Sequence, residues 1–448
     1  MTKPNHSNAT LSQGSETGPE ASPAPPVLLA PTLSRALNFF LWPIAVVIII
    51  HRTWILPQTD HPTDDFYPVW SAIQRFASGL PVYSENYLTT DPHYLYSPGG
   101  TLLLSPLSLW SSIDDARVFF ALAQSAAIIA ALILILRWVD VPVKSPIVPG
   151  FIALAFLSEG VTSTIEFTNV NGSLLFALVL YLLLLTHRRN ILAGLVIGIA
   201  ITIKPVFLPL LFLPFVRKQF SSIAVAVAVV IATNLIGWQL MAQPRDYLEI
   251  TVPYLGIVRD FFNTSLAGQL VWFGADPLLI TMWRTFFAIF VIVGLVLALR
   301  WVDRDEKFWM ATTAGLLLAG AFYISILGQQ YYSIMLIPMV ATLFRPLLGV
   351  RAESGELART VMLNVPAGVA TVFCFLHASW MLPDRDFFTH WFSMALGGVG
   401  WALFILTIAG VMIRLTIMDM QRGISVAAGY GWLRSWKPGA TAKIEQHA

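Results

Sequence analysis

Long runs of apolar residues, separated by short polar segments, fill most of the chain from about residue 36 to residue 415. A helix of about 20 apolar residues is long enough to cross the roughly 30 Å hydrocarbon core of a bilayer. The pattern therefore predicts membrane-spanning helices near 36–51, 115–137, 146–162, 171–187, 219–241, 275–300, 308–327, 331–347, 359–380 and 389–415. A further apolar stretch, 190–217, is interrupted by Lys204-Pro205. We expect a bent pair of short helices there, since each half is too short for a comfortable crossing, and about twelve membrane segments in all.

A different pattern follows the first predicted span. Apolar side chains recur at helical spacing after Asp64 and Asp65, at positions 66, 67, 69, 70, 73 and 76. This spacing predicts an amphipathic helix that lies along the membrane interface.

The composition supports a membrane location. Of the 448 residues, 56% are hydrophobic and 12% are charged, and the mean hydropathy is +0.70. Soluble domains carry about 25% charged residues, so the chain is predicted to be an all-α polytopic membrane protein. Residues 1–34 are polar and lack aromatic rings, which predicts a disordered cytoplasmic tail rather than a cleaved signal. We expect a transmembrane domain over 35–416 and a cytoplasmic C-terminal tail over 417–448.

The basic residues indicate the orientation of the helices. With the N-terminal tail inside, 19 of the 27 Lys and Arg residues lie on the cytoplasmic face, as expected for retained positive charge. The loops 52–114, 163–170, 242–274, 328–330 and 381–388 then lie outside the plasma membrane. No basic run or reader motif suggests a nucleic acid partner. The single cysteine, Cys374, excludes an internal disulfide and a cysteine metal cluster.

Asp64 and Asp65 are candidates for chemistry in the first outer loop. Carboxylates at a helix N-terminus often satisfy free backbone N–H groups and interact with the helix dipole. The alternative is a general base that takes a proton from an incoming hydroxyl. The residues alone leave both interpretations open.

Basic side chains on the same face suggest a binding site for phosphate. Lys204 lies in an apolar stretch, where a charge is costly unless it faces a cavity, a partner or the interface. Arg259 lies in an outer loop, and a guanidinium can bind two phosphate oxygens at once. We assign both to a phosphate group, with His93 as a candidate third donor.

Rings, hydroxyls and amides are dense in the outer loops, above all in TDPHYLYSPGG, residues 90–100. Sugars offer apolar faces for stacking and hydroxyls for hydrogen bonds, so this composition suits a sugar. Tyr and Trp also form ordinary belts at membrane interfaces, and the amides can instead cap helices. The candidate sugar or acceptor residues are Trp70, Asp91, Tyr94, Tyr96, Asn169, Asn171, Asn263, Gln330 and Tyr331.

The sequence holds no nucleotide-phosphate loop, dinucleotide fingerprint, zinc-protease motif or serine-nucleophile motif in a suitable context. An enzyme on the outer face has no nucleotide sugars, so a sugar linked to a lipid phosphate is the economical donor. A transporter or flippase for such lipids also needs a polar cavity and basic residues. Internal repeats are typical of transporters, and we find none here.

Six ordered blocks resemble glycosyltransferase family 87, of the GT-C fold class. They are TDDFYPVW, DPHYLYSPGGTLL, FTNVNG, IKPVFLPLLFLP, RDFFNTSLAG and QQYYSIMLIP. The likeness covers most of the chain after the tail and makes 35–416 a GT-C catalytic domain. Ser97-Pro98 and Thr168–Asn171 depart from the pattern of the family's mannosyltransferases. This disfavours a mannosyl donor, which remains the alternative within the family.

The resemblance implies a decaprenyl-phosphate-arabinose donor and an arabinan acceptor of cell-wall arabinogalactan or lipoarabinomannan. It implies α-(1→3) branches, made by inverting single displacement, without a nucleotide cofactor; a divalent cation is left open. It also implies that the acidic residue of the first outer loop is the base, and Asp65 matches better than Asp64 because it directly precedes Phe66. Linkage rests on the resemblance alone.

Overall fold

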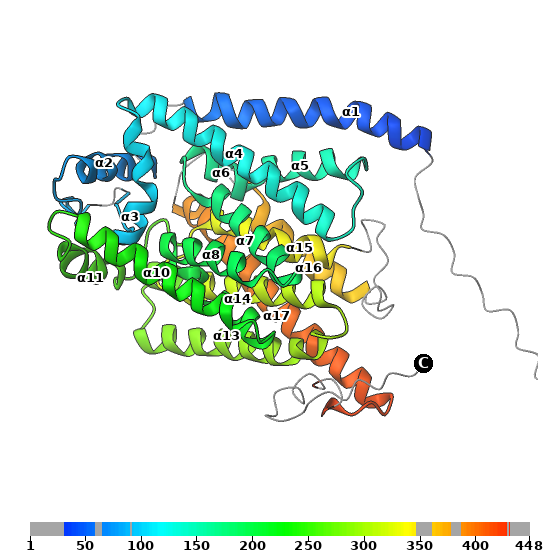
Figure 1. The fold of residues 1–448 in the computed structure, drawn as a ribbon. Helices are drawn as coiled ribbons and strands as arrows, with labels where there is room; N and C mark the ends of the chain where they lie inside the picture. The colour runs from blue at the N-terminus through cyan, green and yellow to red at the C-terminus, as the bar shows by residue number, and fades with distance from the viewer. Residues whose placement is uncertain are drawn as a thin grey trace, which may run out of the picture.

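The structure is a computed structural model that describes residues 31–58, 65–89, 92–345, 361–377, 387–427 and 430. Within these ranges every regular element is a helix (Figure 1). The prediction of an all-α polytopic fold is confirmed. The proposed tail boundaries at 34 and 416 stay predictions, since described helices begin at Pro31 and end at Gln421.

Six helices in the described ranges are long and apolar enough to cross a membrane, or seven if one bent pair counts as a span. They are α1 (Pro31–Ile50, extended by the π-helix η1, His51–Ile55), α4 (Ile113–Trp138), α10 (Phe220–Leu240), α13 (Pro277–Ala298), α14 (Glu306–Ile324) and α17 (Phe387–Gln421). All six coincide with predicted spans.

The remaining apolar runs form shorter or bent helices. The predicted span 146–162 is α5 (Ile147–Leu157) and α6 (Glu159–Glu166), bent by 60°. The bend falls at Ser158, whose backbone is extended with a ψ of 151°. The other short helices are α7 (Asn171–Thr186), η7 (Gln330–Leu336) with α15 (Ile337–Leu343), and α16 (Val361–Phe375). The count of about twelve membrane segments therefore stays a prediction.

The stretch around Lys204-Pro205 is broken where the sequence indicates. Helix α8 (Asn190–Ile203) ends at Lys204, and the 3₁₀ helix η4 (Pro205–Leu211) and α9 (Phe212–Val216) follow. Lys204 has φ −134° and ψ 105°, because a residue before proline is pushed out of the helical region.

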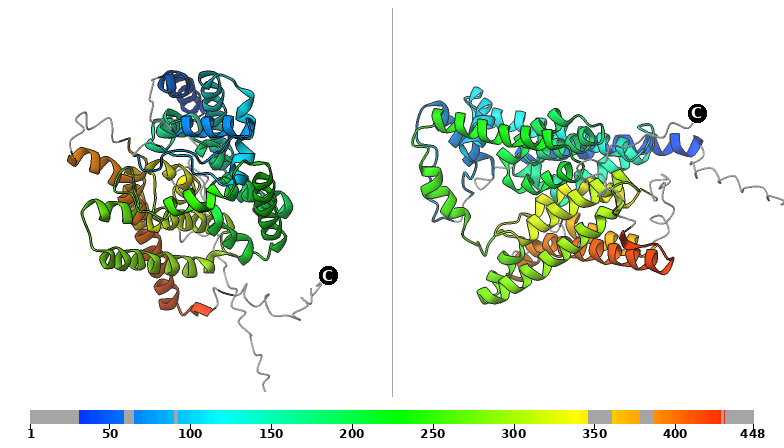
Figure 2. Two further views of the ribbon diagram at one scale, coloured as in Figure 1. Left: turned by 90° about the vertical axis from the view of Figure 1, so that its left-hand side faces the viewer. Right: turned by 60° about the horizontal axis from the view of Figure 1, so that its bottom comes forward.

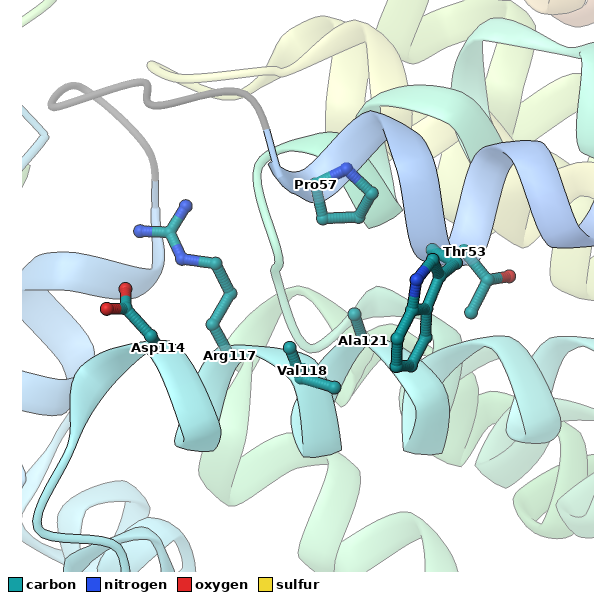
Figure 3. Close-up of a pocket in the computed structure, with 7 residues that line it drawn as sticks. Thr53, Pro57, Asp114, Arg117, Val118 and Ala121 are labelled. Carbon is teal, nitrogen blue, oxygen red and sulfur yellow. The ribbon is translucent and has the colours of Figure 1, made fainter.

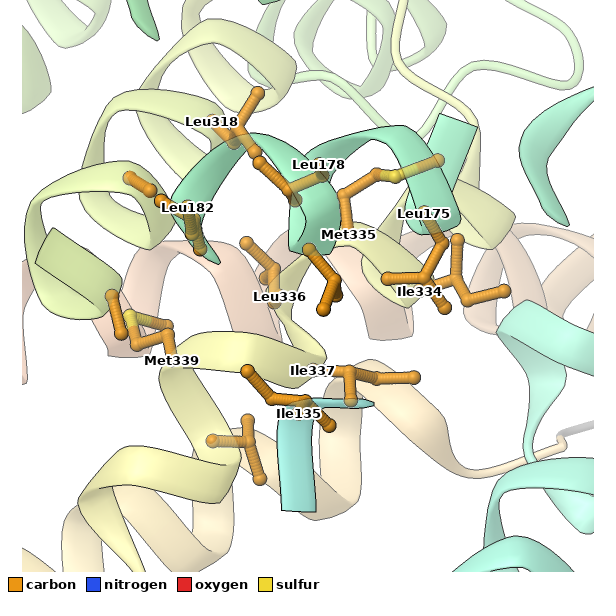
Figure 4. Close-up of a cluster of buried hydrophobic side chains, with 14 of the residues drawn as sticks. Ile135, Leu175, Leu178, Leu182, Leu318, Ile334, Met335, Leu336, Ile337 and Met339 are labelled. Atoms are coloured by element: carbon orange, nitrogen blue, oxygen red, sulfur yellow. The ribbon is translucent and has the colours of Figure 1, made fainter. Parts of the chain in front are cut away.

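The main apolar core lies where α4, α7, α14 and η7 meet (Figure 4). Side chains such as Ile135, Leu178, Leu318 and Leu336 are almost fully buried there. Helix α7 starts close to α4, because a Cβ at Gly172 would lie 2.6 Å from the carbonyl oxygen of Gln124. Only glycine therefore fits at this contact.

Helices α13, α14 and α17 pack side by side, and two views of the ribbon show this group (Figures 1 and 2). At one end of the group Arg300 and Arg304 bind Asp419, and Lys307 and Arg345 bind Asp140. All four basic residues belong to the predicted cytoplasmic face. Helix α14 runs from this end to Ile324, so Ser325, where the segment toward η7 begins, lies about 28 Å away, at 1.5 Å per residue.

The segment SPGG at residues 97–100 is fixed against α10. Ser97 caps α3 (Pro98–Leu104) by accepting from the N–H of Gly100 at 3.2 Å. The N–H of Gly99 donates to Asn234 at 3.1 Å. A Cβ at Gly237 would lie 2.2 Å from the carbonyl oxygen of Pro98, so α3 and α10 touch through their backbones. This contact anchors the loop that carries Tyr96.

Candidate active site

Asp65 directly precedes α2 (Phe66–Ala77). Its side chain makes no capping hydrogen bond to α2. One carboxylate oxygen, Oδ2, instead accepts from the hydroxyl of Tyr331 at 2.9 Å and from the amide of Asn169 at 3.5 Å. The apolar side of α2 anchors this end of the helix, since Phe66 is buried and pairs with Phe120 of α4.

The turn FTNVNG, between α6 and α7, supplies two of the predicted amides. Thr168 adopts φ 49°, which reverses the chain, and the side chain of Asn169 accepts from the N–H of Asn171 at 3.0 Å. The turn thereby directs the amide of Asn169 toward Asp65. It places Asn171, which is fully buried, as the first residue of α7.

Lys204 lies beside this turn. Its ammonium donates to Oδ1 of Asn171 at 2.7 Å and lies 4.5 Å from the ring centroid of Tyr332. The charge of Asp65 acts on this ammonium. The break before Pro205 thus brings Lys204 into the same site as the carboxylate. The Nδ2 atom of Asn171 is enclosed and has no hydrogen-bond partner within the described ranges.

Three tyrosines surround the carboxylate. Tyr331 and Tyr332 belong to η7, and their rings pair at 5.2 Å. Tyr96 belongs to the loop before α3, where its carbonyl oxygen accepts from Tyr83 at 2.9 Å. Burial, followed by the charge of Asp65, raises the pKa of Tyr96, so this phenol stays protonated near the carboxylate. These rings offer hydroxyls and apolar faces around Asp65.

Arg259 lies at the edge of this group. Its guanidinium is 5.6 Å from the ring centroid of Phe261 and 5.9 Å from that of Tyr254. Its charge acts on Tyr332, whose ring also contacts Lys204. The two predicted phosphate ligands therefore approach the same tyrosine.

His93 and Tyr94, which were predicted to bind phosphate and sugar, contact other residues of their own loop, of α3 and of α11 (Val252–Leu255). The ring of His93 packs against Tyr87 and Tyr254 at 4.9 and 5.3 Å, and Nδ1 lies 3.6 Å from a carboxylate oxygen of Glu85. Tyr94 is fully buried, and its hydroxyl donates to Thr101 at 2.8 Å. These contacts stabilise the described parts of this loop, 83–89 and 92–97, and no contact of His93 or Tyr94 with Asp65 is found in the described part of the chain.

The structure also shows the hydrogen bonding of three further predicted residues, Asn263, Trp70 and Gln330. Asn263 uses its amide to hold a turn, since it donates to the carbonyl oxygens of Arg259 and Ile326 and accepts from the N–H groups of residues 265 and 328. The indole N–H of Trp70 and the Nε2 atom of Gln330 are enclosed and have no partner among the described residues. Asp64 and Asp91 lie outside the described residues. Elsewhere, no three His, Cys, Asp or Glu side chains of the described ranges gather as a metal site.

A cavity of about 230 Å³ opens next to the start of α2 (Figure 3). It is lined by η1 and the first turns of α4, including Thr53, Asp114 and Arg117. The guanidinium of Arg117 lies 5.9 Å from the ring centroid of Phe66, the residue after Asp65. The cavity thus adjoins the helix that directly follows the candidate base.

Tyr332 is a site residue that was not predicted. It follows Tyr331 in QQYYS, and the block pointed to the right segment. The two adjacent side chains are chemically alike. Only the fold shows that the Tyr331 hydroxyl donates to Asp65, and that the Tyr332 ring lies nearer the ammonium of Lys204 than the Tyr331 ring does.

The fold and the site define a class of protein. Membrane-length helices mark a multi-pass membrane protein. Among the described residues, the carboxylate of Asp65, the ammonium of Lys204 and three tyrosines from distant segments form a largely enclosed polar site. This arrangement suits an enzyme that acts on a polar substrate at the membrane.

The model for glycosyltransferase family 87 matches residues 94–325. An alpha-(1->3)-arabinofuranosyltransferase of Corynebacterium glutamicum is 40% identical over 86% of this chain and 90% of its own length. Proteins of the same name from Mycolicibacterium smegmatis and Mycobacterium tuberculosis are 35% and 37% identical, over 86% and 71% of this chain and 87% and 74% of their own lengths. The chain belongs to glycosyltransferase family 87, so the predictions of this family and of a glycosyltransferase are confirmed.

Proposed function

We propose that this glycosyltransferase moves an arabinofuranosyl residue from decaprenyl-phosphate-arabinose to an arabinan acceptor and forms α-(1→3) branches. The names of the relatives support the sugar and the linkage. The observation that carries the chemistry is the carboxylate of Asp65, which accepts a hydrogen bond from Tyr331 and acts on the charge of Lys204.

The reaction is a single displacement. A hydroxyl oxygen of the acceptor attacks the anomeric carbon of arabinose, and Asp65 takes the hydroxyl proton. The bond from the anomeric carbon to the phosphate oxygen breaks, and decaprenyl phosphate leaves with that electron pair. Attack and departure on opposite faces invert the anomeric configuration.

The cations serve the leaving group. A departing phosphate needs positive charge to stabilise its growing negative charge. Lys204 supplies an ammonium near Asp65, and Arg259 supplies a guanidinium that can bind two phosphate oxygens. One carboxylate is then sufficient, unlike the pair used by retaining glycosidases.

The site belongs on the outer side of the plasma membrane. The basic residues Arg300, Arg304, Lys307 and Arg345 gather at the opposite end of α14. Basic residues are retained on the cytoplasmic side of membrane proteins. Asp65 and Lys204 then face the compartment in which lipid-linked sugars and cell-wall acceptors meet.

Purified protein in proteoliposomes tests this function. Decaprenyl-phosphate-arabinose and a synthetic arabinan acceptor are supplied, and the product is analysed by NMR. The expected product carries new arabinose at position 3, with its anomeric configuration inverted relative to the donor.

Matched reactions separate the alternatives. A product from decaprenyl-phosphate-mannose, with none from the arabinose donor, would identify a mannosyltransferase. Movement of the intact lipid-linked sugar across the bilayer, without a glycosidic product, would identify a transporter. A retained anomeric configuration would contradict the single displacement.

A further inference from the structure

Arg284 is a charged residue inside a helix that otherwise suits the membrane. Helix α13 is apolar and long enough to cross a membrane, and most of its apolar side chains are not buried in the protein. Arg284 lies seven residues after Pro277, about 10 Å along the helix at 1.5 Å per residue. A charge at this depth is costly unless it reaches a partner or the interface.

The protein provides hydrogen-bond acceptors for only some of the N–H donors of this side chain. Its Nε–H donates to the carbonyl oxygen of Ile324 at 2.7 Å, one of the last carbonyls of α14, which have no partner within that helix. A guanidinium has five N–H donors. The two terminal nitrogens of Arg284 have no hydrogen-bond or ion-pair partner among the described residues.

Several side chains around Arg284 are apolar and exposed. Met282, Trp283 and Phe286 are 60%, 43% and 40% exposed, and a tryptophan at this position is typical of the membrane interface. Thr281, Arg284 and Thr285 are three and four residues apart, so they share one face of the helix. This polar stripe lies at the outer-leaflet end of α13 in the predicted topology.

The same backbone segment links Arg284 to the candidate active site. Asn263 donates to Ile326, two residues beyond the partner of Arg284, and to Arg259, at 2.8 and 2.9 Å. The charge of Arg259 in turn acts on Tyr332, whose ring contacts Lys204. The amide of Asn263 therefore ties the segment that Arg284 contacts to the backbone of Arg259, and the charge of Arg259 acts on the same tyrosine that Lys204 contacts.

We propose that Arg284 is a capture site for the phosphate group of the lipid-linked donor in the outer leaflet. The planar fork of a guanidinium matches two oxygens of a phosphodiester, and the terminal nitrogens are the donors that the protein leaves available. The phosphate then passes to Arg259 and Lys204, where the sugar meets Asp65. This inference rests on the proposed function.

The test compares Arg284→Gln and Arg284→Lys with Arg245→Gln. Arg245 is an exposed residue of the predicted outer loop 242–274, outside α13, and controls for a lost positive charge. Each protein is reconstituted in vesicles of phosphatidylcholine. KM and kcat are measured with decaprenyl-phosphate-arabinose and with a short-chain analogue that dissolves in water.

Arg284→Gln is expected to raise KM for the decaprenyl donor about tenfold, as for loss of one charge-assisted phosphate contact, with kcat unchanged. KM for the short-chain donor stays unchanged, Arg284→Lys recovers part of the loss, and Arg245→Gln behaves as wild type. Equal KM values in wild type and Arg284→Gln would overturn the proposal, as would an equal loss of kcat with both donors. An effect confined to binding of added phosphatidylglycerol would show a bulk-phospholipid site and also overturn it.

Binding of radiolabelled decaprenyl phosphate without turnover distinguishes this inference from the proposed function. Weaker binding by Arg284→Gln than by Arg245→Gln supports capture of the lipid phosphate even if arabinose transfer is not observed. Unchanged binding, together with normal arabinose transfer, would contradict the capture site alone.

Discussion

Gly172→Ala tests whether the start of α7 positions the site. The added Cβ would lie 2.6 Å from the carbonyl oxygen of Gln124, whereas ordinary contact begins near 3.4 Å. The two helices must therefore separate by about 0.8 Å, the difference between these distances. The obstacle is backbone, so no side-chain rotation relieves it.

The displacement acts on both stability and activity. Overpacking of a well-packed contact costs roughly 1–3 kcal/mol of unfolding free energy. Asn171, which holds Lys204, precedes the substituted residue, and a misplacement of about 1 Å near a reacting group can reduce the rate about 100-fold. We expect kcat for transfer to fall by about 10- to 100-fold, while the protein still inserts into the membrane.

The assay compares Gly172→Ala with Gly368→Ala in the same proteoliposomes. A Cβ at Gly368 in α16 would meet nothing within 4 Å, so this variant controls for the change from glycine to alanine in a helix. Thermal unfolding in detergent measures stability, and initial rates measure transfer. Wild-type kcat in Gly172→Ala would refute the inferred coupling between the α4–α7 contact and Lys204.

The remaining predictions concern charge and ion pairing. Lys204→Gln removes the ammonium near the leaving phosphate and should reduce kcat about 100- to 1,000-fold, the usual effect of losing one stabilising donor; a change in KM alone would contradict this role. Asp419→Asn breaks the buried pair with Arg300, whose side chains are 5% and 3% exposed, and should lower the unfolding free energy by roughly 3–5 kcal/mol. Asp246→Asn, at a partly exposed carboxylate with no ion pair among the described residues, is the control in thermal unfolding. Equal losses of unfolding free energy in the two variants would refute the larger cost expected for breaking the buried pair.

The helices were the most predictable part of the fold. Runs of about 20 apolar residues correspond to α4, α10, α13 and α14 almost residue for residue. Hydropathy cannot count the crossings, because α7 and α8 are as apolar as the long helices but have only 16 and 14 residues. The bend at Ser158 was also missed, since a serine within an apolar run is compatible with a straight helix.

The candidate site was predictable in its residue types and only partly in its contacts. Asp65 and Lys204 could be selected from the sequence, because a charged side chain beside or within a membrane span is costly unless it has a partner or a function. The partners of His93 could not be predicted, since it meets Tyr254 only through the folding of a distant loop. Likewise, nothing in the sequence shows that the side-chain amide of Asn263 forms hydrogen bonds with the backbone of a turn.

The transfer rate of Asp65→Asn tests the central claim most directly. Asparagine keeps the shape of the side chain but cannot accept the proton of the acceptor hydroxyl. The rate is measured with saturating donor and acceptor, and binding of decaprenyl phosphate is measured separately to show that the site is intact. We predict that transfer falls to background while lipid binding is retained; transfer at the wild-type rate would show that Asp65 is not the base.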